Sequence, residues 1–314
     1  MRIYKTILLC AVILIACFSC GCTSGTEDTQ NEKIKVVTTL FPHYDFATAI
    51  GGDKVQVTKL LPWGAESHSY DMTVSDAIEV SCADIFVYTG ENMETWAQEI
   101  LDGTDNKDML VVDLSKGIEL KSISSGHSHT ESSSDYDAHI WTDPDNAIIM
   151  ADEILQALCE RDSKNQQYYT QNAEKLKLQI KELAYELLKI SESYSGETLY
   201  FGSRFAFLYL FDRYGFNYRS PYSGCAEHSE PGIKTVSEII SEMKNDKTEY
   251  IFIQEMSESK IAKSIAEETG AHMLVLHSCH NLSKDEAKEG QTYVTIMRKN
   301  IQNIKEVIGE GKQS

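Results

Sequence analysis

Apolar residues recur along the chain in two alternating patterns. Short apolar runs predict strands at 34–40, 54–61, 84–88 and 109–112, and the segments between them have apolar residues at helical spacing. A helix connects each predicted strand to the next, and such crossover connections favour parallel pairing of the strands. The pattern therefore predicts a parallel sheet covered by helices.

A long amphipathic segment follows. Apolar residues recur at helical spacing from Ser163 to Ser191, a helix roughly 40 Å long at 1.5 Å per residue. The alternation then returns, with strands predicted at 198–201, 216–218, 250–254 and 272–276, and a helix from Arg204 to Tyr214. The predicted fold class is α/β, with two parallel-sheet lobes joined by one long rigid helix.

This pattern sets the expected domain boundaries. They are a signal peptide at 1–16, a lipidated flexible tether at 17–33, an N-terminal lobe at 34–162, a linking helix at 163–193 and a C-terminal lobe at 194–314. Within the first lobe, residues 121–138 are rich in serine and acidic residues and predict a mobile loop.

The amino terminus predicts the compartment. Arg2 and Lys5 precede an apolar run that ends at Ala16, and Cys17 follows it. A run this short favours a cleaved signal over a membrane span, and a small residue before a cysteine is typical of bacterial lipoprotein processing. An uncleaved anchor is the alternative. In either case the protein is expected outside the cytoplasm, held to the cell membrane at its amino terminus, with Cys17 as the lipidated residue.

Charge and cysteines add two expectations. The formal net charge of −19 disfavours binding to nucleic acid. Cys225 and Cys279 lie in polar segments of the second half, and outside the cytoplasm they are expected to form a disulfide. Metal ligation by one of them is the alternative.

Histidines gather where the predicted strands end. The carboxyl ends of the predicted strands carry three of them, His68, His139 and His277. Arg204 and Glu255 lie at equivalent strand ends, where parallel sheets place their ligands. Imidazoles from separate loops can close a tetrahedral metal site, so joint ligation of a metal is predicted. His127 and His129 in the acidic loop are candidates for an auxiliary metal-capturing segment.

Motifs for catalysis are absent from the sequence. It contains no HExxH, no GxSxG, no phosphate-binding loop and no dinucleotide fingerprint. We therefore expect a protein that is not an enzyme. A zinc-dependent hydrolase with Glu255 as its base is the less favoured alternative.

Several motifs resemble one known family. They include FPHYDFA at 41–47, IGGDKV at 50–55, ADIFVY at 83–88, HIWTDPDN at 139–146, RYG at 213–215 and AEETGA at 266–271. Together they resemble the metal-binding lipoproteins of bacterial ATP-binding-cassette importers for zinc and manganese. The resemblance covers the chain from Ile34 onward, and it implies a metal site buried between two lobes.

The resemblance also assigns ligand positions. The family's first two histidine ligands fall on His68 and His139, its third on Arg204 and its fourth on His277. Because arginine stays protonated and cannot ligate a metal, Arg204 is expected to hold a ligating group by hydrogen bonds instead. His68, His139 and His277 then need one further ligand, for which Glu255 and His280 are the leading candidates, ahead of Cys225 and His228.

Together these features predict a function. Three imidazoles favour zinc, with manganese as the alternative. We expect a monomeric receptor that binds zinc with high affinity outside the cytoplasm and delivers it to the permease of an ATP-binding-cassette importer. The alternative class is a surface adhesion lipoprotein whose metal is structural.

Overall fold

The computed structural model describes residues 33–123, 136–222, 231–257 and 259–309. Its first sheet has four parallel strands in the order β2-β1-β3-β4. These are β1 (Ile34–Thr38), β2 (Val55–Lys59), β3 (Ile85–Tyr88) and β4 (Leu110–Asp113). The parallel sheet predicted for the first half of the chain is confirmed.

The second half carries two parallel strand pairs. They are β5 (Thr198–Tyr200) with β6 (Asn217–Arg219), and β7 (Tyr250–Ile253) with β8 (His272–Val275). A parallel bridge between Phe201 and Phe252 joins the two pairs, and Gly202 donates its N–H to the carbonyl of Phe252 at 2.8 Å. The four strands thus lie side by side in the order β6-β5-β7-β8.

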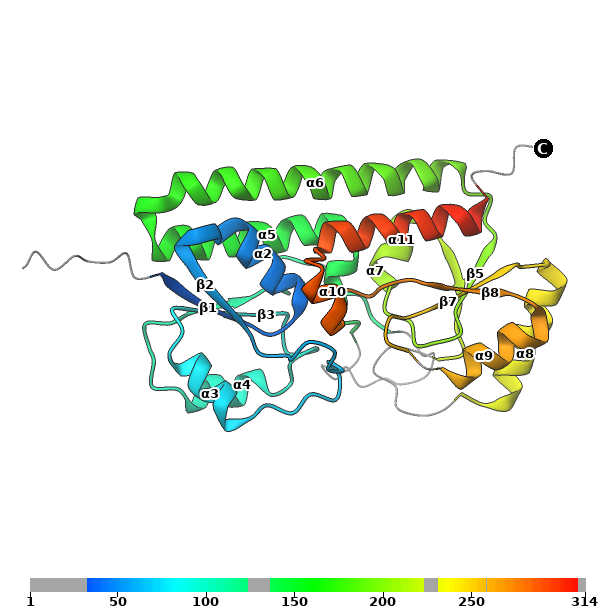
Figure 1. Ribbon diagram of the computed structural model, residues 1–314, viewed down its shortest axis with the longest axis horizontal. Helices are drawn as coiled ribbons and strands as arrows, with labels where there is room; N and C mark the ends of the chain where they lie inside the picture. The colour runs from blue at the N-terminus through cyan, green and yellow to red at the C-terminus, as the bar shows by residue number, and fades with distance from the viewer. Residues whose placement is uncertain (1–32, 124–135, 223–230, 258, 310–314) are drawn as a thin grey trace, which may run out of the picture. The chain divides into compact units, whose positions relative to one another are not determined.

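Helices cover both sheets. In the first half these are α2 (Phe41–Gly51), α3 (Val74–Ser81), α4 (Ala97–Gly103) and α5 (Pro144–Arg161). In the second half they are α7 (Leu208–Tyr214), α8 (Ile233–Asp246), α9 (Lys260–Thr269), α10 (Lys284–Lys288) and α11 (Tyr293–Ile308). Figure 1 shows α3 and α4 beside the first sheet, and α8 and α9 beside the second.

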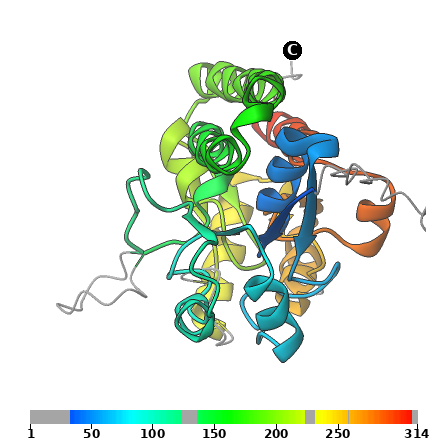
Figure 2. The same ribbon diagram turned by 90° about the vertical axis from the view of Figure 1, so that its left-hand side faces the viewer.

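The long helix is α6 (Gln166–Ser193), with 28 residues. It packs on α5, α2, α7 and α11, and so runs past both sheets (Figure 1). The view along its axis places α6 outermost, above the layer that contains α5 and α11 (Figure 2). The predicted long connecting helix is confirmed, although its first turn begins later than predicted because Ser163–Asn165 form a separate 3₁₀ turn.

Local signals account for several helix ends. Thr73 caps α3, where its side chain accepts the N–H of Asp76 while the Asp76 carboxylate accepts the N–H of Thr73. Asp143 caps α5, and Pro144 occupies the first helical turn, where a missing N–H costs nothing. Gly215 ends α7 with φ of 68°, a conformation that glycine adopts without strain.

One helix start differs from its prediction. We expected a helix from Arg204, but α7 begins at Leu208. The segment between β5 and α7 packs its aromatic rings together instead, with Phe205 against Phe201 at 4.9 Å between ring centroids and stacked on Tyr218 at 3.7 Å. This packing holds Arg204 in an irregular loop.

One hydrophobic core spans both halves of the chain. It includes Trp141, Tyr169, Tyr209 and Tyr293, all fully buried, and continues from β1 and α2 through α6 to β5 and α11. Residues 34–314 accordingly form one compact unit. The boundaries predicted for the two lobes stay predictions.

Some predicted features lie outside the described residues. These are the signal segment with Cys17, most of the acidic loop with His127 and His129, and the segment with Cys225 and His228. Among the helices that are described, none has the length and apolar character needed to cross a membrane.

Candidate metal centre

Three histidines from separate loops meet at one point. His68 lies in the loop after β2, His139 precedes the 3₁₀ turn Ile140–Thr142 (η3), and His280 lies in the loop after β8. One nitrogen from each ring lies within 4.8 Å of the other two. His139 and His280 are 3% and 7% exposed, so the group lies mostly away from bulk water.

The spacing suits a tetrahedral metal. Nε2 of His68 lies 3.3 Å from Nε2 of His139. Two nitrogens bound tetrahedrally at 2.0–2.1 Å to one zinc ion would lie about 3.3 to 3.4 Å apart. The ring centroids of His139 and His280 are 4.6 Å apart, and those of His68 and His280 are 5.0 Å apart. The three rings can therefore share one ion with small adjustments.

Asp137 orients His139. Its Oδ1 atom lies 2.8 Å from Nδ1 of His139 and also accepts the backbone N–H of His139 at 2.8 Å. Burial would raise the pKa of Asp137, but the charge and hydrogen bonds of His139 outweigh it and hold that pKa below its usual value. A carboxylate on Nδ1 leaves Nε2 as the metal-facing nitrogen.

A second polar chain orients His280. Nδ1 of His280 pairs with the hydroxyl of Ser278, and that hydroxyl also bonds Oε1 of Glu255. Burial lowers the pKa of His280 well below its usual value, and the neighbouring His139 and His68 lower it further. The ring is therefore neutral, as a metal ligand must be.

The other nitrogen of His280 has no partner. Nε2 is buried and has no hydrogen bond in the part of the chain that the structure describes. A buried nitrogen without a partner costs free energy, which a bound metal ion would relieve.

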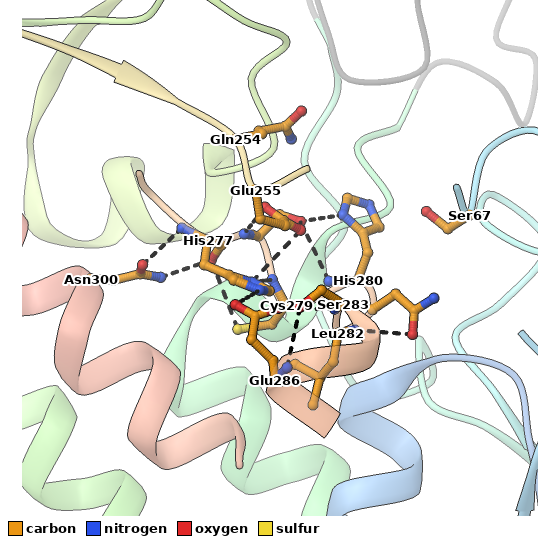
Figure 3. A network of polar contacts seen from close by, with 12 residues as sticks. Ser67, Gln254, Glu255, His277, Cys279, His280, Leu282, Ser283, Glu286 and Asn300 are labelled. Atoms are coloured by element: carbon orange, nitrogen blue, oxygen red, sulfur yellow. Dashed lines mark hydrogen bonds and ion pairs between the residues drawn. The ribbon is translucent and has the colours of Figure 1, made fainter. Parts of the chain in front are cut away.

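His277 points elsewhere. Its Nδ1 accepts the N–H of Cys279 at 2.9 Å, and its Nε2 faces Glu286 at 3.6 Å (Figure 3). Its backbone is held by Asn300, which accepts the N–H at 2.8 Å and donates to the carbonyl at 2.7 Å. The structure thus places His280, and not His277, beside His68 and His139.

Glu255 and Arg204 border the centre. Glu255 Oε2 accepts the N–H of Ser278 at 2.8 Å, and Oε1 accepts its hydroxyl, so both carboxylate oxygens are engaged (Figure 3). Arg204 lines a cavity of about 360 Å³ that His280 and Glu255 also line. Neither residue belongs to the group of three histidines.

Cys279 separates His277 from His280. It is fully buried, it carries a free thiol, and its φ of 60° lies in the left-handed region. Burial raises the pKa of this thiol well above its usual value. Cys225, its predicted disulfide partner, lies outside the described residues.

The loop that carries His280 is fixed to the first half of the chain. Nε1 of Trp141 donates to the carbonyl of Ser278 at 2.7 Å. The amide of Asn281 donates to the carbonyls of Pro62 and Ala65 at 2.6 and 3.1 Å, and its oxygen accepts from Lys59 at 2.9 Å. These bonds place His280 opposite His68.

Sequence reasoning missed the residues that orient the ligands. Asp137 and Ser278 each stand two positions before a clustered histidine, a spacing that was available as a signal. The sequence carries no comparable signal for Trp141, which lies 137 positions from Ser278.

Comparisons with known proteins agree with this geometry. Residues 36–307 match the family model "Zinc-uptake complex component A periplasmic". The chain is 29% identical over 306 residues to the high-affinity zinc uptake system protein ZnuA of Bacillus subtilis, covering 94% of this chain and 95% of that protein. It is also 29% identical to the zinc-binding lipoprotein AdcA of Streptococcus pneumoniae, covering 95% of this chain but 59% of AdcA.

Solved structures are similar across the same region. The Zn(II)-bound ZnuA-like domain of S. pneumoniae AdcA superposes with a TM-score of 0.74 at 25% identity, covering 88% of this chain and 100% of that domain. The laminin-binding protein Lmb of Streptococcus agalactiae, described as bifunctional with adhesin and metal-transporting activity, has a TM-score of 0.75 at 27% identity, covering 88% of this chain and 99% of Lmb.

Proposed function

Because the chain belongs to the family of periplasmic zinc-uptake complex components A, we propose that His68, His139 and His280 bind zinc for delivery to an importer. The protein works outside the cytoplasm as the zinc-binding component of an ATP-binding-cassette uptake system and is not an enzyme. The observation that carries this proposal is the 3.3 Å distance between Nε2 of His68 and Nε2 of His139. This distance matches the separation of two nitrogen ligands on a tetrahedral zinc ion.

The donor set favours zinc over manganese. Three neutral imidazoles suit zinc, whereas manganese prefers more oxygen ligands. Asp137 bonds Nδ1 of His139, and Ser278, itself bonded to Glu255, pairs with Nδ1 of His280, so Nε2 in each of these two rings is oriented before the ion arrives. We therefore assign zinc as the cargo and His280 as the third ligand in place of His277.

Arg204 marks an atypical branch of the family. The resemblance places a histidine ligand at this position, and a permanently protonated guanidinium cannot take that role. Arg204 instead borders the cavity next to His280. We propose that, among the described residues, three histidines ligate the ion and that its fourth coordination position faces the cavity that His280 lines.

The remaining assignments concern residues outside the described part. We propose that Cys17 carries the lipid that anchors the protein to the membrane, that His127 and His129 help to capture the ion, and that the partner is the importer's permease. We retain the Cys225–Cys279 disulfide as a proposal. The protein acts as a monomer.

Calorimetric titration with zinc and manganese tests the assignment. We expect one zinc per chain, tighter than manganese, and loss of the zinc site in His139→Ala. Asp71→Asn, an exposed change on the loop after His68, serves as the control and should bind zinc as the parent does. A parent protein that binds no zinc, or a His139→Ala variant that binds it as tightly, would show the assignment to be wrong.

Similarity to Lmb favours one second candidate, a surface adhesin whose metal is structural. Chelation separates the two functions. A receptor should keep its far-ultraviolet circular dichroism and a cooperative melting transition when zinc is removed, because one hydrophobic core spans both sheets without the metal. A structural site should unfold when its metal is removed.

A further inference from the structure

A polar cavity is lined by His280, one of the three clustered histidines. Its volume is about 360 Å³, and the side chains that matter here are those of Ser67, Ser203, Arg204, Gln254, Glu255 and His280. Figure 3 shows Gln254, Glu255 and Ser67 around the loop that carries His280. The volume falls within the range of small-molecule sites and far exceeds the roughly 30 Å³ that one water occupies. The cavity can therefore hold a small organic molecule.

The described residues supply only part of a tetrahedral coordination shell here. Among the described residues, three histidines form the only group spaced to share an ion. Glu255 is one of two carboxylates on the cavity wall, with Glu66, and both its oxygens are engaged by Ser278. A fourth ligand from outside the protein would complete the shell without breaking these bonds.

Arg204 gives the cavity a charged hydrogen-bond donor that suits an anion. Its guanidinium has no ion pair or side-chain hydrogen bond with any residue that the structure describes, although the side chain is partly buried. A guanidinium donates two parallel hydrogen bonds to a carboxylate, which matches that group better than it matches water. The chemistry of the cavity thus points to a carboxylate.

The cavity also carries negative charge. Glu66 and Glu255 line it together with Arg204, so a free anion would be repelled. A divalent ion on the three histidines reverses the local charge. The anion should therefore bind only when the metal is present.

We propose that this cavity binds a small carboxylate anion together with zinc, so that the cargo is a zinc–carboxylate complex. One carboxylate group replaces a water on the ion's fourth position and accepts hydrogen bonds from Arg204, and the displaced water leaves to solvent. This inference rests on the proposed zinc-binding function and adds the chemical class of the co-ligand.

Equilibrium dialysis tests the inference. The purified protein is dialysed against radiolabelled citrate, and separately against radiolabelled L-histidine, with and without one equivalent of zinc. We expect about one molecule of at least one probe retained per chain, only when zinc is present. Arg204→Ala should weaken retention at least tenfold, and Arg204→Lys should restore part of it, because an ammonium group carries the charge without the two-pronged geometry.

Two controls keep the outcomes separate. Arg298→Ala removes a partly exposed arginine that pairs with Glu182 at 3.7 Å, and it should retain the probe as the parent does. Arg204→Ala should still bind zinc in a carboxylate-free buffer. If the parent binds zinc but retains neither probe, or if Arg204→Ala retains a probe equally well, the co-ligand inference is overturned and the zinc function stands. If the parent binds no zinc, the proposed function itself fails.

Discussion

His139 is held by Asp137 through two hydrogen bonds to the same carboxylate oxygen, one from the backbone and one involving the ring, each 2.8 Å long. The two residues are separated by a single position, so backbone and side chain are fixed together. Both side chains are almost fully buried, with 4% exposure each. The direction of Nε2 in His139 is therefore set before any ion binds.

Removing the charge of Asp137 should weaken zinc binding. Asp137→Asn keeps the shape of the side chain but loses the carboxylate that polarises the ring, and we expect zinc affinity to fall about 10- to 100-fold. Competition with a chromogenic zinc chelator measures this change, with Asp71→Asn as the exposed control. An unchanged affinity in a folded Asp137→Asn protein would contradict this role for Asp137.

The two histidines of the loop after β8 should respond differently. His280→Ala removes a clustered nitrogen and should lower zinc affinity by more than about 100-fold. His277→Asn keeps an acceptor for the N–H of Cys279, so zinc affinity should stay within about threefold while the melting temperature falls. Calorimetry and thermal melts measure both effects. Equal losses of zinc in the two variants would place His277 in the site after all.

Glu94 should make stability depend on pH. It is buried, and burial raises its pKa to about 7 even though Thr39, Thr89 and Gly90 donate hydrogen bonds to it. The folded protein therefore holds this proton more tightly than the unfolded chain. The resulting stabilisation is fully present below pH 4.5, the ordinary pKa of glutamate, and is lost as the pH rises toward 7.

Glu94→Gln should flatten this dependence. Relative to the parent, its free energy of unfolding should fall less between pH 5 and 7, by up to about 1.4 kcal/mol per pH unit. Urea titrations at several pH values measure the difference. Glu79→Gln, an exposed change on α3, should follow the parent, and a Glu94→Gln profile parallel to the parent would contradict the raised pKa.

Trp141 should support both stability and the position of His280. Trp141→Phe removes the N–H that reaches the carbonyl of Ser278 at 2.7 Å and leaves a buried acceptor without its donor. We expect a loss of about 1–3 kcal/mol in the free energy of unfolding and a weaker zinc site. Denaturant titration and calorimetry measure these effects, and Trp96→Phe provides a second tryptophan change that leaves the bond to Ser278 intact. A stable variant with weakened zinc binding would still support the positioning role, whereas parental values for both would rule it out.

Much of the fold followed from the sequence because it depends on repeating patterns. The strands and the long helix α6 are set by apolar spacing, and Thr73, Pro144 and Gly215 mark boundaries through local chemistry. The predicted helix start at Arg204 was wrong, because Phe205 packs against Phe201 and Tyr218 and keeps this segment out of the helix. Such packing between residues far apart in the sequence does not show in the spacing of apolar positions along the chain.

The candidate site was only partly predictable for a similar reason. His68 and His139 stand next to regular elements, so their positions follow from the order of strands and helices. His277 is the first histidine after its strand, but the chain turns at Cys279 in a left-handed conformation and brings His280 forward instead. That turn depends on hydrogen bonds to Asn300 and Trp141, which only the folded chain brings together.

Asn281 bonds the loop that carries one clustered histidine to the segment that leads to another. Ser278 of the same loop also bonds Glu255, which follows β7, so this loop ties the His68 segment to the second sheet. A tilt of the second sheet away from the first must therefore break one of these two sets of bonds. The loop after β8 thus couples the spacing of the two sheets to the integrity of the histidine cluster.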